Sequence, residues 1–138
     1  MPVIIALLST VLLLISMGFF MLGSLPLLVL KHDTPLDSSF IRGLFDVYYT
    51  AVMLTSTVAA ASYGFAGWPT FSVGLCGVGV LAFLLRRTVI SRMDQLRSTM
   101  TSTDKAAISR FRRLHIGGML VNFVQLGSLA WALTFLRL

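Results

Sequence analysis

The chain contains few charged residues. Asp, Glu, Lys and Arg together make up 12% of its 138 residues, whereas 57% are hydrophobic. A soluble domain carries about twice that charged fraction. The mean hydropathy of +0.89 points the same way, so we expect a membrane protein. The length allows one domain.

Carboxylates are scarce as well. All five acidic residues are aspartates, at Asp33, Asp37, Asp46, Asp94 and Asp104. Most of them fall outside the apolar stretches of the chain. A hydrolase that acts through a pair of acidic side chains is therefore not expected.

The sequence also lacks the short motifs of several enzyme classes. Cys76 is its one cysteine, which excludes an internal disulfide and any CxxC or Cys/His cluster. No Gly-rich phosphate loop, GxSxG nucleophile elbow or HExxH zinc motif occurs. Whether the protein is an enzyme thus stays open, although the missing motifs argue against it.

Basic residues exceed acidic ones, and the formal net charge is +6. The high hydropathy and the absence of a nucleic-acid-binding motif argue against a nucleic-acid partner. Eight of the eleven Lys and Arg residues lie between residues 86 and 113. The positive-inside rule therefore places this segment in the cytoplasm.

Four apolar stretches are long enough to cross a bilayer, whose hydrocarbon core of about 30 Å takes about 20 helical residues. Backbone groups in lipid must be satisfied internally, so these runs predict helices. We expect the helices at about residues 3–30, 44–62, 71–100 and 103–136. The prediction is a single domain, residues 1–138, with an all-α, up-down, four-helix transmembrane fold. The first stretch has no basic n-region and no clear cleavage site, so we interpret it as a retained span.

An even number of spans puts both termini on the same side of the membrane. With residues 86–113 in the cytoplasm, residues 31–43 follow there, and both termini lie outside. Residues 63–70 carry no charge and contain Gly-Trp-Pro, which suits a tight turn with an interfacial aromatic residue. A bacterial inner (cytoplasmic) membrane is the expected location.

The basic segment is expected to be helical too. Val89, Met93, Leu96 and Met100 recur at helical spacing, so helices three and four should extend beyond the membrane as a basic cytoplasmic hairpin. Between them, Thr101 with Asp104 matches a capping box, although Ser102 or Thr103 could serve as the cap instead. The hairpin is either a solvated surface that faces lipid headgroups or a docking surface for a partner protein.

Small residues are placed for close helix packing in lipid. They are Ala60 and Gly64 in the second stretch, Gly74, Gly77 and Gly79 in the third, and Gly117, Gly118, Gly127 and Ser128 in the fourth. The sequence leaves open whether they serve contacts within one chain or between chains.

Polar residues inside the spans are the main candidates for a functional site. At about 100° per residue, His115, Asn122 and Gln125 share one face of the fourth helix. Asp46 lies near the cytoplasmic end of the second helix, with Tyr49 beside it. Asp46 could therefore meet His115, Arg112 or Arg113. These groups serve as hydrogen-bonding contacts between helices, as a ligand or cofactor site, or as a proton or ion path.

A metal site can be drawn but is not the prediction. Met17, Met21, Met53 and Met119 are soft ligands that suit copper(I), and we expect some of them near His115. Methionine also routinely fills gaps in apolar packing. No paired histidines or local metal motif occur, so we predict no metal and leave the cofactor unknown. His32 follows a basic residue in a loop, and we expect it to be exposed to solvent.

Three stretches resemble parts of two known families of small membrane proteins. From Arg86 to Gln125, a basic segment leads into Phe111, His115 and Asn122, and this resembles the transmembrane-protein-205-like family of four-helix membrane proteins. GFFMLGSLP, residues 18–26, and FIRGLFDVYY, residues 40–49, are similar to the anthrone-oxygenase-like family. The resemblance implies the four-helix topology and marks His115 and Asn122 as family-typical positions. The second family implies cofactor-independent oxidation of a polycyclic phenol.

Three functions follow as hypotheses. The leading one is an accessory or binding subunit of a membrane complex, which meets lipid and either a protein partner or further copies of itself through its small-residue faces and the basic hairpin, residues 86–113. The alternative is a membrane oxidoreductase or oxygenase that acts on a quinone or polycyclic substrate. His115 would then be the acid/base or ligand, and the substrate would be positioned by Asp46, Tyr49, Arg112, Asn122 and Gln125. The third is a small metal-handling or transport protein.

Overall fold

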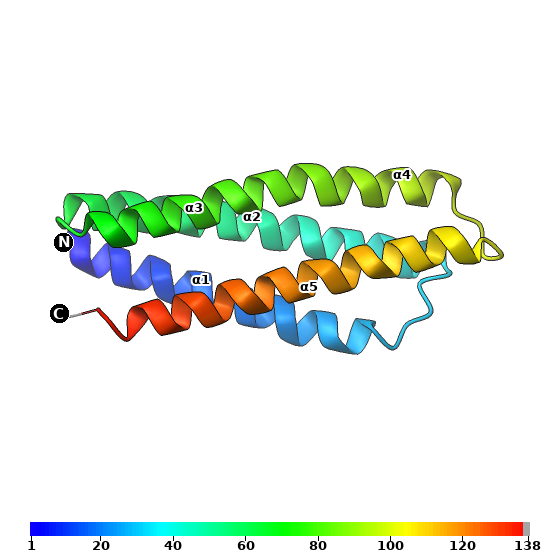
Figure 1. The fold of residues 1–138 in the computed structure, drawn as a ribbon, viewed down its shortest axis with the longest axis horizontal. Helices are drawn as coiled ribbons and strands as arrows, with labels where there is room; N and C mark the ends of the chain where they lie inside the picture. Colours follow the sequence, from blue (N-terminus) through cyan, green and yellow to red (C-terminus); the bar gives the residue numbers. More distant parts are fainter. Residues whose placement is uncertain (137–138) are drawn as a thin grey trace.

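The computed structural model describes residues 1–136, which form helices and no strands (Figure 1). The elements in chain order are α1 (Pro2–Leu27), α2 (Pro35–Phe65), α3 (Pro69–Leu85), the π-helical turn η1 (Arg86–Ile90), α4 (Ser91–Thr99) and α5 (Lys105–Leu133). Four helical segments of 26 to 31 residues are long and apolar enough to cross a membrane, because α3, η1 and α4 join into one. The all-helical prediction is confirmed for the described residues, and the chain is an integral membrane protein.

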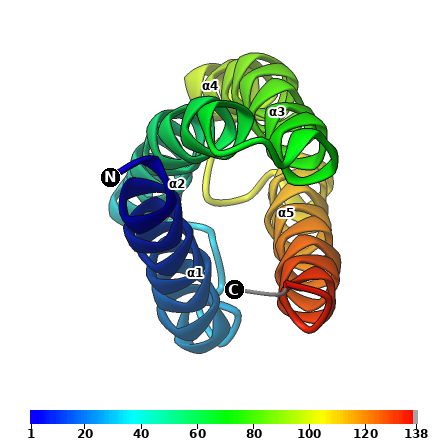
Figure 2. The same ribbon diagram turned by 90° about the vertical axis from the view of Figure 1, so that its left-hand side faces the viewer.

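Consecutive long helices run in opposite directions along the molecule (Figure 1). The start of α1, the end of α5 and the turn between α2 and α3 lie at one end, and the two other connections lie at the opposite end. Viewed along the long axis, the helices follow an arc in the order α1, α2, α3, α5 (Figure 2). The buried core includes large side chains from α1, α2 and α5, such as Phe20, Phe45 and Phe111.

The first connection is much shorter than the sequence suggested. α2 begins at Pro35 rather than near residue 44, because Thr34 accepts a hydrogen bond from the Asp37 backbone N–H at 3.1 Å and a proline occupies the first turn. The polar residues 35–43 are therefore helical. At the other connection the cap is Asp104 itself, whose carboxylate accepts from the Ala107 N–H at 3.0 Å. The expected cap at residues 101–103 was wrong by one to three residues.

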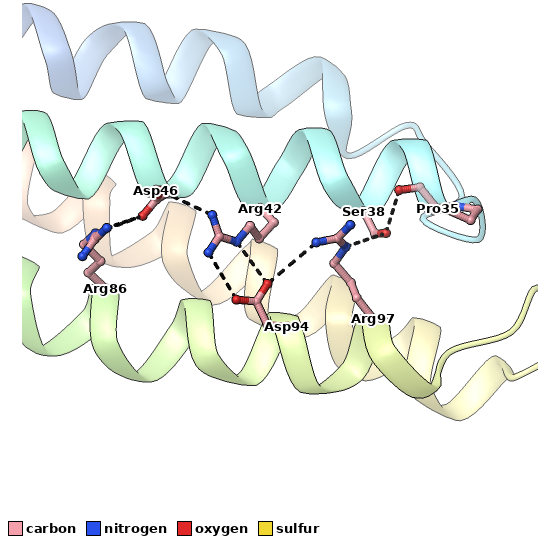
Figure 3. Close-up of polar contacts among 7 residues, drawn as sticks. All are labelled: Pro35, Ser38, Arg42, Asp46, Arg86, Asp94 and Arg97. Atoms are coloured by element: carbon pink, nitrogen blue, oxygen red, sulfur yellow. Dashed lines mark hydrogen bonds and ion pairs between the residues drawn. The ribbon is translucent and has the colours of Figure 1, made fainter.

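Charged side chains connect α2 to the extension beyond α3 (Figure 3). Asp46 pairs with Arg42 at 3.3 Å and with Arg86 at 2.9 Å. Arg42 also pairs with Asp94 at 3.0 Å, and Arg97 approaches the same carboxylate at 3.7 Å. These partly exposed pairs, which we call the charge ladder, hold η1 and α4 against α2. Two aspartates thus neutralise three of the arginines at this end of the molecule.

The small residues divide into two groups. Gly79 packs against α2, since a Cβ there would lie 2.8 Å from the Ser56 hydroxyl, and a Cβ on Gly118 would overlap the Phe45 ring. Gly74 and Gly77, by contrast, face open space with nothing within 4 Å of such a Cβ. The first group serves packing within the chain, whereas the second has open space beside it.

Candidate functional site

The polar residues of α5 point toward two different neighbours. His115 and Asn122 are fully buried and face α1, α2 and the first connection. Gln125 instead lines a groove against α3. The three-residue step from Asn122 to Gln125 turns the side chain by about 60° around the helix, which is enough to reach the next helix in the arc. The three residues therefore do not line one site.

Asn122 is tied to two other helices. The Tyr48 hydroxyl donates to Asn122 Oδ1 at 2.6 Å, and Asn122 Nδ2 donates to the Met17 carbonyl oxygen at 3.1 Å. The Tyr48 ring stacks on Phe20 with a centroid distance of 4.0 Å. A buried amide with both ends bonded joins α1, α2 and α5. This geometry favours a contact between helices over a ligand site at Asn122.

His115 meets the other histidine of the chain. His32 Nε2 and His115 Nδ1 are 3.0 Å apart, and both side chains are fully buried. The Phe45 ring lies edge-on to His115, and Phe111 lies beside His32. One ring must donate and the other accept, so the bond fixes complementary tautomers. The two remaining ring nitrogens, His32 Nδ1 and His115 Nε2, have no hydrogen-bond partner among residues 1–136.

The exposure expected for His32 is wrong. Its backbone adopts a left-handed conformation, with φ of 62°, which turns the side chain away from solvent and into the protein. Burial lowers the pKa of the imidazole by more than the nearby Leu30 backbone raises it, and the positive charge of Arg112 adds to the lowering. No residue near His32 in the sequence signals this burial, since a histidine between lysine and aspartate reads as a solvated loop.

Asp46, Tyr49 and Arg112 have different contact partners. Asp46 belongs to the charge ladder and pairs with Arg42 and Arg86. The sequence had instead suggested His115, Arg112 or Arg113 as its partner. Arg112 donates to the Leu28 carbonyl oxygen at 3.0 Å, at the end of α1. The Tyr49 side chain is buried against Phe45. The substrate pocket hypothesised for an oxidoreductase from these residues therefore stays a prediction.

The methionines are likewise dispersed. Met17 and Met119 are buried, Met21 packs at the edge of the core, and Met53 lines a groove between α2 and α3 with Cys76. Met53 therefore faces α3 rather than His115. Among residues 1–136, no group of three His, Cys, Asp or Glu side chains is placed to hold a metal ion. The histidine pair by itself could supply two nitrogen ligands to a metal ion.

The groove between α3 and α5, which we call the α3/α5 groove, has a volume of about 710 Å³. Gly74 and Gly77 form part of its α3 wall, and Gln125 and Ser128 form part of its α5 wall. The amide Nε2 of Gln125 is buried and has no hydrogen-bond partner within the described part of the chain. The groove is apolar apart from a few such groups, which is typical of binding sites between helices.

Comparison of the chain with protein-family models, with curated proteins and with solved structures finds no match. The resemblance to the transmembrane-protein-205-like and anthrone-oxygenase-like families therefore stays a prediction.

Proposed function

We propose that this protein is a small binding subunit of a membrane complex, and that it holds a transmembrane helix of a partner protein in the α3/α5 groove. The observation that carries the proposal is the open groove of about 710 Å³ walled by Gly74 and Gly77, with the polar side chain of Gln125 in its α5 wall. The protein has the role of an accessory component and not of a catalyst.

The length of the groove supports a helix as its occupant. Lining residues run from Thr70 to Leu81 on α3, and from Val124 on α5 to Phe135 just beyond the end of that helix. Eleven residue steps correspond to about 16 Å, or three helical turns. A compact ring system would fill only part of that length, whereas an apolar helix lying along the groove would contact both walls.

The chemistry of the walls supports a protein rather than a lipid tail. A hydrocarbon chain offers no hydrogen-bonding group to the polar side chains of Gln125 and Ser128 in the groove wall, and an unmet polar group in lipid is costly. A partner helix supplies acceptors through polar side chains or a distorted backbone. Glycines also let two helix backbones approach closely, and a Cβ at Gly74 or Gly77 would meet nothing in this chain.

The orientation that accompanies this role is N-out and C-out. In the up-down bundle we propose, the positive-inside rule puts the basic hairpin of α4 and the start of α5 in the cytoplasm. The α3/α5 groove then lies in the outer half of the membrane, near the turn between α2 and α3. The expected membrane is the bacterial inner membrane.

Site-directed photocrosslinking in native membranes tests the proposal. A photoreactive residue in place of Ser128, inside the groove, should give a discrete adduct whose linked peptide belongs to a transmembrane helix of another protein. The same group in place of Phe123, which is exposed on α5 outside the groove, should not give it. Gly77→Leu fills the groove and should lower the yield at least fivefold.

Gly117→Leu is the matched control, because a Cβ there also meets nothing within 4 Å but points away from the groove. It should leave the adduct unchanged, and circular dichroism should find both variants equally helical. Three results would overturn the proposal: adducts to lipid alone, an adduct to a second copy of this chain, or equal yields in the two variants.

A further inference from the structure

We infer that a second cleft, between α4 and α5, binds the headgroup of an anionic glycerophospholipid. This basic cleft has a volume of about 660 Å³, and its walls include Arg92 from α4 and Arg110 and Arg113 from α5. Leu96 and Leu114 contribute apolar surface to it. The site is separate from the α3/α5 groove and does not depend on the role proposed for that groove.

The three arginines have no acidic partner. None of Arg92, Arg110 and Arg113 forms an ion pair with another residue of the described chain, and no aspartate lines the cleft. The neighbouring hollow between α2 and α4 differs, since its arginines face Asp46 and Asp94 of the charge ladder (Figure 3). Uncompensated positive charge therefore collects in the basic cleft.

Guanidinium groups are well matched to a phosphate diester. Each presents a planar fork of N–H donors that can bond two phosphate oxygens at once. Arg110 and Arg113 are three residues apart on one face of α5, and Arg92 lines the opposite wall of the cleft, on α4. N–H donors from two helices can thus surround one anionic group. A diffuse basic surface does not have this arrangement.

The position of the cleft indicates a lipid and not a soluble phosphate. Residues 114–136 contain no Asp, Glu, Lys or Arg, so the cleft lies where the charged part of α5 meets its membrane span. Ile116 and Leu120 continue from Arg113 along α5 and are exposed. A headgroup held by the arginines would place its acyl chains along this apolar surface. Basic pockets of this kind on the cytoplasmic side suit anionic headgroups.

The test is native mass spectrometry of the purified full chain in neutral detergent, titrated with phosphatidylglycerol or with phosphatidylcholine. Phosphatidylglycerol should bind at least tenfold more tightly. The triple variant Arg92→Gln, Arg110→Gln, Arg113→Gln should lose that preference and bind the two lipids about equally.

A second triple variant, Lys31→Gln, Arg87→Gln, Lys105→Gln, provides the control. It removes the same charge from residues that do not line the cleft, and it should change the affinity less than threefold. An equal loss in both triples would mean attraction to diffuse charge and would overturn the site. Displacement of the lipid by millimolar inorganic phosphate would identify a soluble anion as the ligand, and would overturn the lipid assignment.

Discussion

The buried hydrogen bond between Tyr48 and Asn122 gives the most direct test of how the helices are held together. Tyr48→Phe removes only the hydroxyl, because the ring keeps its place on Phe20. Asn122 Oδ1 then loses the donor that lies 2.6 Å away. The substitution isolates one polar contact between α2 and α5.

The expected cost is about 1 kcal/mol. Hydrogen bonds between membrane helices average about 0.6 kcal/mol with a maximum near 1.7, and a buried acceptor left without a donor adds to the loss. Asn122→Leu should cost about 1 to 2 kcal/mol, because it also removes the bond to the Met17 carbonyl oxygen. In the double variant the two losses should not add, and the coupling should be about 0.6 to 1.7 kcal/mol.

The assay is reversible unfolding in mixed micelles of dodecyl sulfate and a mild detergent, followed by circular dichroism. Tyr49→Phe is the matched control: Tyr49 is also buried, and its hydroxyl forms no hydrogen bond to a described residue. It should be close to neutral. If Tyr48→Phe were as neutral as Tyr49→Phe, or if the two losses added fully, the bond would not hold α2 to α5 and the reasoning would fail.

Two further predictions concern stability. Gly118→Ala should destabilise the fold by about 1 to 3 kcal/mol, because the added methyl group overlaps Phe45; Gly117→Ala, with open space at its Cβ, should be neutral, and thermal unfolding compares the two. Stability should fall as the pH drops below the ordinary histidine pKa of 6.5, because burial lowers the pKa of His32 and the unfolded chain then binds a proton that the folded chain excludes. Above pH 6.5 His32 is neutral in both the folded and the unfolded chain, so its contribution to the free energy of unfolding no longer changes with pH. His32→Asn, which tolerates the left-handed backbone, should flatten the dependence of the unfolding midpoint between pH 7.5 and 5, and an unchanged dependence would exclude His32 as its source.

Much of the fold follows from local pattern. The apolar stretches are each about as long as a membrane is thick, so their helical state required no tertiary information. Boundaries were less secure, and α2 starts at Pro35 rather than near residue 44. The polar residues 35–43 lack the apolar signal of a span, and their helix is stabilised by the Thr34 cap and by the charge ladder on Arg42.

The candidate site was predicted only in part. Helical spacing put His115 and Asn122 on one face, and both are buried. It could not separate Gln125 from them, because a 60° turn matters only once a second neighbouring helix stands beside α5. It also could not find His32, whose approach to His115 spans 83 positions of the chain.

By itself, the sequence determined the helical state, the number of spans and the concentration of basic charge at one end, because each depends on composition within a single segment. The tertiary structure decided which groups meet. Asp46 pairs with arginines and not with His115, and His32 is buried. Gly74 and Gly77 face open space, whereas Gly79 and Gly118 pack within the chain. The physical reason is that a helix fixes the direction of each side chain, whereas the rotation and distance of its neighbours determine what that side chain contacts.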